Sequence, residues 1–315
     1  MPNIEEQNLT EFLLEVKAKM ANISTSQNNE INDINQYVLN NSGKFIRSKI
    51  IYLYGLEIGV KKPKLVELAS AAELIHLSTL IHDDIIDEAD LRRDMPTVVK
   101  KWGIKKAILY GDFLYTKTFQ GLNSLENTDI ADVLINCAEA LIEGEFNQLK
   151  IKDSSTFSMA EYFDVIEKKT AVLFSGVLKC LGIEAKLPMQ DITELEQLGL
   201  SFGRAFQIND DLSDFEDSKT TGKAKFKDLA EGKLTLPMIF LLGSLQEAEQ
   251  IEILKIIESG KFFRIKQVLE SSGSFEKARH ERQVAINHCI EYTERFIKLD
   301  KLDEIKTFIK NILVA

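Results

Sequence analysis

The amino-acid sequence predicts an all-α protein, on three observations. Apolar residues recur at spacings of three and four along most of the 315 residues, which is the period of amphipathic helices. No sustained apolar–polar alternation is bounded by Asn-Gly or Asp-Gly turns, so strands are not predicted. Only 5 prolines and 16 glycines interrupt the chain. We therefore expect a single domain over residues 1–315, a bundle of about ten to thirteen helices.

The clearest helical segment runs from Ile130 to Leu149, where apolar side chains return every three or four positions. The same spacing marks the segments 65–86, 192–212, 236–245, 251–257 and 284–297. Breaks rich in Gly, Pro, Ser, Asn, Asp or Lys separate the periodic segments, at 40–43, 59–63, 94–96, 123–128, 152–156, 182–188, 217–222 and 271–274.

The composition restricts the function. Hydrophobic residues make up 44% and charged residues 28%, which is typical of a globular protein, and the net charge of -10 disfavours a general nucleic-acid binder. Cys137, Cys180 and Cys289 form no zinc or disulfide pattern, so we expect reduced thiols in a cytoplasmic protein. Residues 1–10 do not resemble a secretory signal, and no apolar run reaches the roughly 20 residues of a membrane span, so no membrane anchor is expected.

Two acidic clusters of the same spacing stand at the ends of apolar helical segments: Asp83, Asp84 and Asp87, then Asp210, Asp211 and Asp214. At about 100° per residue, the three carboxylates of each cluster share one side of a helix. Crowded carboxylates repel one another unless a cation neutralises them. Hard oxygen ligands suit Mg²⁺, which often bridges to substrate phosphates. A chance acidic helix end explains one such cluster more easily than two.

Basic residues follow or precede these clusters at Lys44, Arg47, Arg92, Arg93, Lys168, Lys169, Lys223 and Lys233. Singly, each is most simply an ordinary surface cation. Together they could supply the donors that diphosphate groups require.

With these residues the chain resembles the trans-isoprenyl diphosphate synthases, also called polyprenyl synthetases. Residues 82–97 (HDDIIDEADLRRDMPT) match the first aspartate-rich motif of that family, and residues 206–215 (FQINDDLSDF) match the second. GKFIR (43–47), ELIH (73–76), EGEFNQL (143–149), KKT (168–170) and GKAKFKDLAEGKLTLP (222–237) occur in the expected order. The matches cover residues 43–237.

The resemblance implies an isoprenoid synthase fold around a deep central cavity, with the two aspartate clusters facing each other. It implies that all six aspartates hold Mg²⁺, about three ions, against the diphosphate of the allylic substrate. Arg92, Lys169, Lys223 and Lys233 would assist at that diphosphate. Lys44, Arg47, His76 and Arg93 would bind isopentenyl diphosphate, and Thr170 and Gln207 would lie near the reacting carbon. The catalytic set would be Asp83, Asp84, Asp87, Lys169, Thr170, Gln207 and Asp210.

The implied chemistry is ionisation of the allylic C–O bond, attack by the double bond of isopentenyl diphosphate, and proton loss to the released diphosphate. His82 is expected to be structural, and a lone histidine such as His76 is otherwise most often a core residue. The chain departs from the family pattern at Ser48, where Pro is usual, at Asp94, where Gly is usual, and at Ala224 and Phe226 in the loop motif.

Product length is expected to depend on the helix face before Asp83. Ala71, Ala72, Ile75, Ser78 and Thr79 lie on or beside that face, and the small side chains of Ser78 and Thr79 predict a deep tunnel and a product of C30–C40 or longer. Phe119, Phe146 and Phe174 are alternative plugs. A primer such as farnesyl diphosphate is expected.

Other functions stay open at this point. They are a geranylgeranyl diphosphate synthase and the catalytic subunit of a heterodimer with a smaller partner. A terpene cyclase is disfavoured by the second DDxxD and by GKFIR. The family default is a homodimer, with 107–119 and 130–149 as candidate interfaces.

Overall fold

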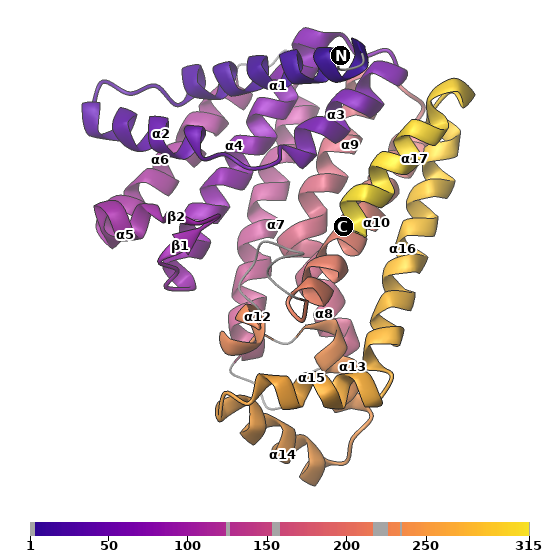
Figure 1. Cartoon of the computed structure of the whole chain (residues 1–315). Helices are drawn as coiled ribbons and strands as arrows, with labels where there is room; N and C mark the ends of the chain where they lie inside the picture. Colours follow the sequence, from indigo (N-terminus) through magenta and orange to yellow (C-terminus); the bar gives the residue numbers. More distant parts are fainter. Residues whose placement is uncertain (1–3, 124–126, 153–157, 217–225, 234, 315) are drawn as a thin grey trace. The chain divides into compact units, whose positions relative to one another are not determined.

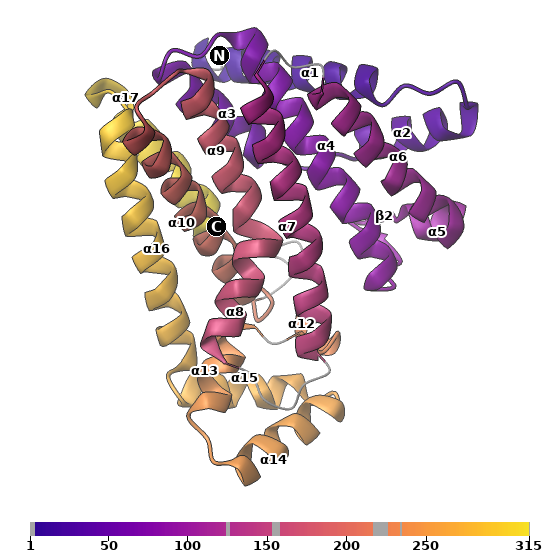
Figure 2. The same ribbon diagram turned by 180° about the vertical axis from the view of Figure 1, so that it is seen from behind.

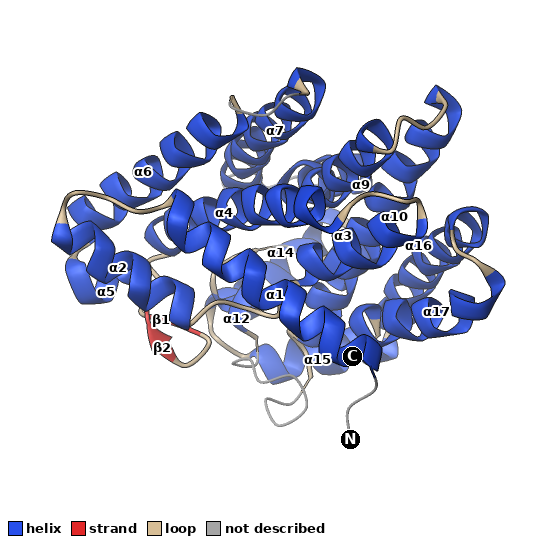
Figure 3. Ribbon diagram, turned by 90° about the horizontal axis from the view of Figure 1, so that it is seen from above, coloured by secondary structure: helices blue, strands red, loops and turns tan. Residues whose placement is uncertain are grey.

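A computed structural model describes residues 4–123, 127–152, 158–216, 226–233 and 235–314. The regular structure of these residues is almost entirely helical, which confirms the predicted all-α class (Figure 3). All six predicted periodic segments are helical, and five agree within a few residues at either end; the helix that contains the segment 284–297 begins earlier, at Ser274. The described residues contain more helices than expected, because short ones such as α5 and α12, of five and four residues, occupy stretches without enough length for a periodic signal. Of the predicted breaks, residues 124–126 of 123–128, residues 153–156 of 152–156 and all of 217–222 lie outside the described residues.

The chain forms two compact units, which are described separately. The first contains residues 1–139, 173–196 and 296–298, and the second contains 140–172, 197–295 and 299–315. The boundaries fall within α7 (Thr128–Lys152), α10 (Met189–Ser213) and α16 (Ser274–Phe296), and next to the start of α9 (Val172–Glu184). The single domain expected from the sequence stays a prediction.

The first unit is organised by α4 (Lys62–Ile86), which packs against α1 (Ile4–Ile23), α3 (Ile46–Glu57) and α6 (Ile104–Leu122) (Figure 1). Twelve of its residues are buried, among them Leu74, Ile75 and Ile81. The sequence was expected to contain no apolar run long enough to span a membrane, yet α4 could cross one by length and composition. However, 61% of its apolar window is buried inside the protein, as in a core helix. The first unit also contains α2 (Asn29–Asn40), β1 (Leu91–Arg92), β2 (Met95–Pro96) and α5 (Val98–Trp102), together with nearly all of α9 and the first parts of α7 and α10.

A short antiparallel hairpin follows α4, although strands were not predicted. Leu91 pairs with Pro96 and Arg92 with Met95. The two loop residues, Arg93 and Asp94, have φ of 52° and 63°. Positive φ at both positions is the geometry of a type I′ turn, whose twist suits a two-residue hairpin and which Asp tolerates. Two residues per strand are too few for a period-two signal, which is why the sequence did not reveal it.

The second unit has its core where α8 (Met159–Ile166) and α10 meet α12 (Lys227–Ala230), α13 (Leu236–Gly243), α14 (Glu247–Glu258), α15 (Phe262–Ser271) and α16. The buried cluster includes Tyr162, Leu212, Phe215, Met238 and Phe275. Figure 2 shows α13, α14 and α15 together beside the start of α16. A single π-helical turn, η1 (Glu167–Ala171), connects α8 to α9, and α17 (Leu299–Leu313) ends the described chain.

Candidate active site

The first aspartate cluster lies at the C-terminal end of α4. Asp83 and Asp84 belong to its last turn, and Asp87 is its C-cap residue. A helix C-terminus carries partial negative charge, so carboxylates there are unfavourable unless a cation is close. No basic residue occupies the last turn. Asp83 and Asp87 are partly exposed, whereas Asp84 is 3% exposed.

Arg92 supplies a cation to the buried member of this cluster. The hairpin places its guanidinium so that Nε and Nη2 each lie 2.8 Å from Asp84 Oδ1. A charge-assisted pair of this kind offsets the cost of burying the carboxylate. Asp84 is therefore already partnered within the first unit, and Asp83 and Asp87 are the more accessible members of the cluster.

His82 has a structural environment, in keeping with the role expected for it. Its Nε2 lies 3.4 Å from Asp112 Oδ1 on α6, and its ring stacks on Tyr115 with centroids 6.0 Å apart. Gly111 makes room for it, since a Cβ at that position would lie 2.4 Å from His82 Nε2. The Tyr115 hydroxyl is buried without a hydrogen-bond partner among the described residues. Burial, and next the charge of Asp83, raise the pKa of Tyr115 above its usual range.

A cationic cluster surrounds His76 in the first unit. The Arg47 guanidinium lies 4.5 Å from the centre of the Phe174 ring, and its Nε is buried without a hydrogen-bond partner among the described residues. Burial lowers the pKa of Arg47 to about 10, with Glu73 acting in the opposite direction. Burial, and then the charges of Arg47, Arg92 and Arg93, lower the pKa of His76 well below its usual value, so the imidazole is neutral near pH 7.

The backbone that carries these cations is unusual. Phe45, immediately before α3, has a φ of 52° in the left-handed region, where a bulky residue is rare. Gly43 lets Arg93 approach, because a Cβ there would lie 2.2 Å from Arg93 Nη2. Lys44 is exposed.

Ser48 stands where the resemblance leads one to expect Pro, and the structure shows what the change allows. Its backbone N–H and its hydroxyl both donate to Glu73 Oε1, at 3.1 and 2.8 Å. A proline could make neither bond. A buried carboxylate is thereby held beside Arg47.

The residues expected to bear on product length are mostly buried in α4. Ala71, Ala72, Ile75 and Ser78 are buried, and the Ser78 hydroxyl donates to the carbonyl of Leu74. Thr79 is partly exposed and donates to the carbonyl of His76. Among the alternative plugs, Phe174 is buried under Arg47, Phe119 stacks on Tyr115, and Phe146 is 70% exposed.

The second aspartate cluster lies at the C-terminal end of α10, in the second unit. Asp210 is partly exposed. Asp211 is 4% exposed and accepts hydrogen bonds from Tyr162, Gln207 and the backbone of Leu236. Burial raises the pKa of Asp211 to about 7 despite these three donors.

Asp214 caps the short helix α12. Its carboxylate accepts hydrogen bonds from the backbone N–H groups of Asp228 and Leu229, at 3.0 and 3.4 Å. Burial, and then the charge of Asp228, raise the pKa of Asp214 to about 6. Asp210 is thus the most accessible carboxylate of this cluster.

Lys169 and Thr170 lie on the π-helical turn. Lys169 forms an ion pair with Glu145 of α7, whose other oxygen is buried without a partner among the described residues. Thr170 donates to Gln207 at 2.7 Å. Lys168 instead pairs with Glu143 and Asp164, at 3.2 and 3.6 Å. The two neighbouring lysines thus have different partners on this π-helical turn, a feature that is frequent at functional sites.

Two glycines permit this arrangement. A Cβ on Gly144 would lie 2.7 Å from the backbone nitrogen of Lys169, and a Cβ on Gly203 would lie 2.3 Å from the Cα of Ala171. Arg204 also holds the turn, because its Nε and Nη2 donate to Glu167 at 3.0 and 2.5 Å. The backbones of α7 and α10 therefore touch η1 directly.

Two lysines were expected to act after the second cluster. Lys233 Nζ lies 2.8 Å from Glu231 Oε2. Lys223 lies outside the described residues.

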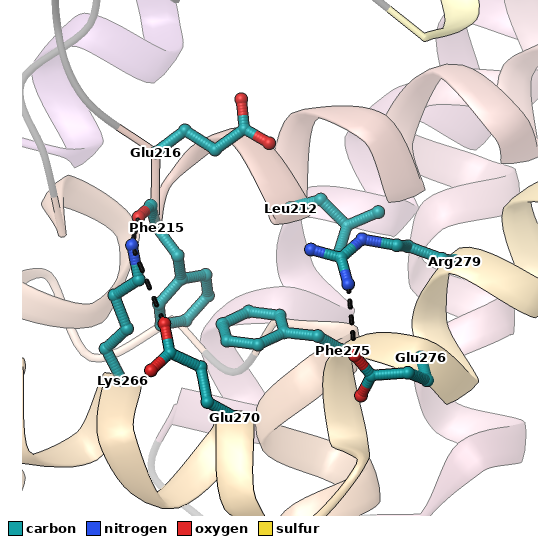
Figure 4. Close-up of a pocket in the computed structure, with 8 residues that line it drawn as sticks. All are labelled: Leu212, Phe215, Glu216, Lys266, Glu270, Phe275, Glu276 and Arg279. Carbon is teal, nitrogen blue, oxygen red and sulfur yellow. Dashed lines mark hydrogen bonds and ion pairs between the residues drawn. The ribbon is translucent and has the colours of Figure 1, made fainter.

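Two cationic side chains, from α15 and α16, donate hydrogen bonds to the C-terminal end of α10. Lys266 of α15 donates to the carbonyl of Phe215 at 2.9 Å, and Arg282 of α16 donates to Asn209 at 2.5 Å. A cavity of about 150 Å³ lies at this end of the helix (Figure 4). It is lined by Leu212, Phe215, Glu216, Lys266, Glu270, Phe275, Glu276 and Arg279. Its two cations already have acidic neighbours, Glu270 for Lys266 and Glu276 for Arg279.

The accessible aspartates of each cluster suit a metal that is shared with a ligand. Within the described part of the chain, no group of three His, Cys, Asp or Glu side chains is placed to hold a metal ion. Mg²⁺ commonly takes one or two carboxylates, several waters and substrate phosphate oxygens. Asp83, Asp87 and Asp210, all partly exposed at helix C-termini, suit that mode.

Sequence reasoning missed several residues that contact the predicted site residues, namely Glu73 and Tyr115 in the first unit and Glu145, Tyr162 and Arg204 in the second. Tyr115 and Tyr162 occur in apolar helical stretches, where an aromatic residue is read as core. Glu145 lies within EGEFNQL, which was recognised as a motif without a role for this residue.

Comparison with known proteins identifies similar chains. Residues 28–293 match the family model described as polyprenyl synthetase. The chain is 33% identical over 267 residues to the octaprenyl diphosphate synthase of Escherichia coli (strain K12), covering 82% of each chain. It is 31% identical over 305 residues to the geranylgeranyl diphosphate synthase of Saccharolobus solfataricus, covering 94% of this chain and 90% of that one. The crystal structure of a decaprenyl diphosphate synthase from Rhodobacter capsulatus is similar with a TM-score of 0.90 and 28% identity, covering 98% and 97% of the two chains.

Proposed function

This chain belongs to the polyprenyl synthetase family and is a prenyltransferase, and we propose that it condenses isopentenyl diphosphate with an allylic diphosphate, trans and head to tail, to make a long polyprenyl diphosphate. The observation that carries the proposal is the position of the aspartate clusters at the C-termini of α4 and α10, with no basic residue in either last turn. Carboxylates in that position favour a bound cation, and a diphosphate with Mg²⁺ supplies one.

We propose that the polar residues form two groups, one for each diphosphate. Arg47, Arg93, Lys44 and the neutral His76 bind the diphosphate of isopentenyl diphosphate. The buried Nε of Arg47 supports this assignment, because a buried donor without a partner costs free energy that a bound phosphate oxygen would recover.

At the allylic diphosphate, the aspartates would hold Mg²⁺, about three ions by the family pattern, and Arg92, Lys169, Lys223 and Lys233 would add positive charge. Bound Mg²⁺ would neutralise the leaving diphosphate. Arg92 keeps Asp84 in place, and Thr170 and Gln207 stand near the reacting carbon. The proton is lost to the released diphosphate, so no protein base is required.

We propose a product of C30–C40 or longer. The support is the small size of Ser78 and Thr79, together with similarity to an octaprenyl and a decaprenyl diphosphate synthase. A geranylgeranyl product is the second candidate, favoured by the similarity to the Saccharolobus solfataricus enzyme. Incubation of the purified chain with farnesyl diphosphate, isopentenyl diphosphate and Mg²⁺ distinguishes them, because products no longer than C20 overturn the long-chain proposal.

We propose a homodimer, with the exposed apolar side chains Ile104, Ile108 and Leu109 of α6 as part of its interface. The alternative is the catalytic subunit of a heterodimer. Gel filtration of the chain alone, combined with an activity measurement, separates the two: an inactive monomer indicates a missing subunit.

A further inference from the structure

A directional hydrogen-bond chain crosses the second unit from α8 to η1. The Tyr162 hydroxyl and the Leu236 backbone N–H both donate to Asp211 Oδ2, each at 2.8 Å. Gln207 Nε2 donates to Asp211 Oδ1 at 3.1 Å. Thr170 Oγ1 donates to Gln207 Oε1 at 2.7 Å. The chain therefore connects a buried tyrosine with the threonine expected beside the reacting carbon.

The chemistry of each group sets the direction of this chain. The amide of Gln207 turns its NH₂ group toward Asp211 and donates to Oδ1. The amide oxygen then faces Thr170, which must donate its only hydroxyl proton to it. What the Thr170 oxygen can offer to any further group is consequently its lone pairs. An oxygen held as an acceptor stabilises developing positive charge, such as that of an allylic cation.

We propose that Tyr162 is a positioning residue for the reaction, which holds the Asp211 carboxylate in the orientation that makes Thr170 an acceptor. The inference rests on the proposed function. Tyr162 and the Leu236 backbone N–H both donate to the Asp211 oxygen that Gln207 does not use, and Tyr162 is the side chain of this pair that helps to keep the carboxylate from rotating. The bond is out of reach of water, because Tyr162 and Asp211 are 3% and 4% exposed, so no solvent molecule replaces a lost hydroxyl.

The position of Tyr162 is itself well defined. It lies one turn after the N-cap Ser158, which forms a capping box with Glu161. Its ring contacts Phe163 edge-on, with centroids 5.4 Å apart, and belongs to the core cluster of the second unit. The helical segment continues without interruption through η1 to Thr170. Removal of the hydroxyl alone should therefore leave the ring in place.

The test compares Tyr162→Phe with Tyr110→Phe. Tyr110 is also buried, and its hydroxyl hydrogen-bonds to Asn35 in the first unit, at 3.2 Å. We expect Tyr162→Phe to lower kcat about tenfold with KM for both substrates unchanged, the effect of one lost buried hydrogen bond on the transition state. Its Tm should fall no further than that of Tyr110→Phe, which should keep the wild-type kcat.

A double-mutant cycle tests whether Tyr162 acts through Thr170. If it does, Tyr162→Phe should change kcat less than about twofold in a Thr170→Val background. If the losses in kcat of the two single variants instead multiply in the double variant, Tyr162 has an independent structural role and the proposal is overturned. A wild-type kcat for Tyr162→Phe would also overturn it. If that variant does not fold, Gln207→Glu breaks the same chain one link further, because a carboxylate cannot donate to Asp211. A wild-type kcat for Gln207→Glu would then overturn the proposal. An inactive wild-type chain would instead overturn the proposed function.

Discussion

Gly203 of α10 lies against the backbone of Ala171 in η1, and its substitution by alanine is the sharpest test of how the site is held. The new Cβ would lie 2.3 Å from Ala171 Cα and 2.5 Å from Ala171 Cβ. An ordinary contact begins at 3.4 Å, so the two backbones must separate by about 1 Å. Neither atom belongs to the far end of a flexible side chain, so no rotamer change relieves the contact.

The consequence for the site follows from one distance. The bond from Thr170 to Gln207 is 2.7 Å and would lengthen beyond the limit of a hydrogen bond, about 3.5 Å. Overpacking of this kind costs about 1–3 kcal/mol, and the better helix propensity of alanine returns up to about 1 kcal/mol. We expect Gly203→Ala to lose about 1–2 kcal/mol in urea denaturation. Its kcat should fall about 100-fold, since a displacement of about 1 Å has that effect in enzymes.

Gly243→Ala is the matched control. Gly243 lies in the same unit at the end of α13, and nothing approaches within 4 Å of the position of its Cβ. This variant should keep the wild-type kcat and be as stable as the parent or slightly more so. A Gly203→Ala protein with wild-type kcat and wild-type stability would refute the reasoning, because the turn could then move without consequence.

Four further outcomes are expected. Arg92→Met should destabilise the protein by about 3 kcal/mol in urea denaturation, because it removes the guanidinium that hydrogen-bonds to the buried Asp84; a loss below about 0.5 kcal/mol would show that the pair is not buried in solution. The lowered pKa of His76 means that below about pH 6.5 the unfolded chain takes up a proton that the folded one does not, so stability falls as the pH falls, and His76→Gln should lose less stability over that range. A chelator should abolish activity, and Mg²⁺ with inorganic diphosphate should raise Tm more than the two separate shifts combined; purely additive shifts would contradict a shared site. Thr79→Phe should shorten the product without unfolding the chain, since Thr79 is partly exposed, and an unchanged product length would remove Thr79 from the tunnel floor.

Much of the helical framework could be predicted from the sequence, because its signals are local. The apolar period predicts α4, α7 and α10, and the spacing of Asp83 and Asp87 places both on one side of a helix end. The ordered motifs identify the family and hence the chemistry. The hairpin at Leu91–Pro96 could not be predicted in this way, because its turn depends on two residues with positive φ that are not glycine.

The sequence alone determined that the protein is helical and which residues could bind metal and diphosphate, since residue type and spacing carry that information. Only the tertiary structure decided how differently the six aspartates are situated. Asp84 is paired with Arg92, Asp211 accepts three hydrogen bonds and Asp214 caps α12, whereas Asp83, Asp87 and Asp210 are partly exposed. The physical reason is that some of the hydrogen-bond partners come from residues far away in the chain, such as Tyr162 and Leu236, which no local pattern connects to an aspartate.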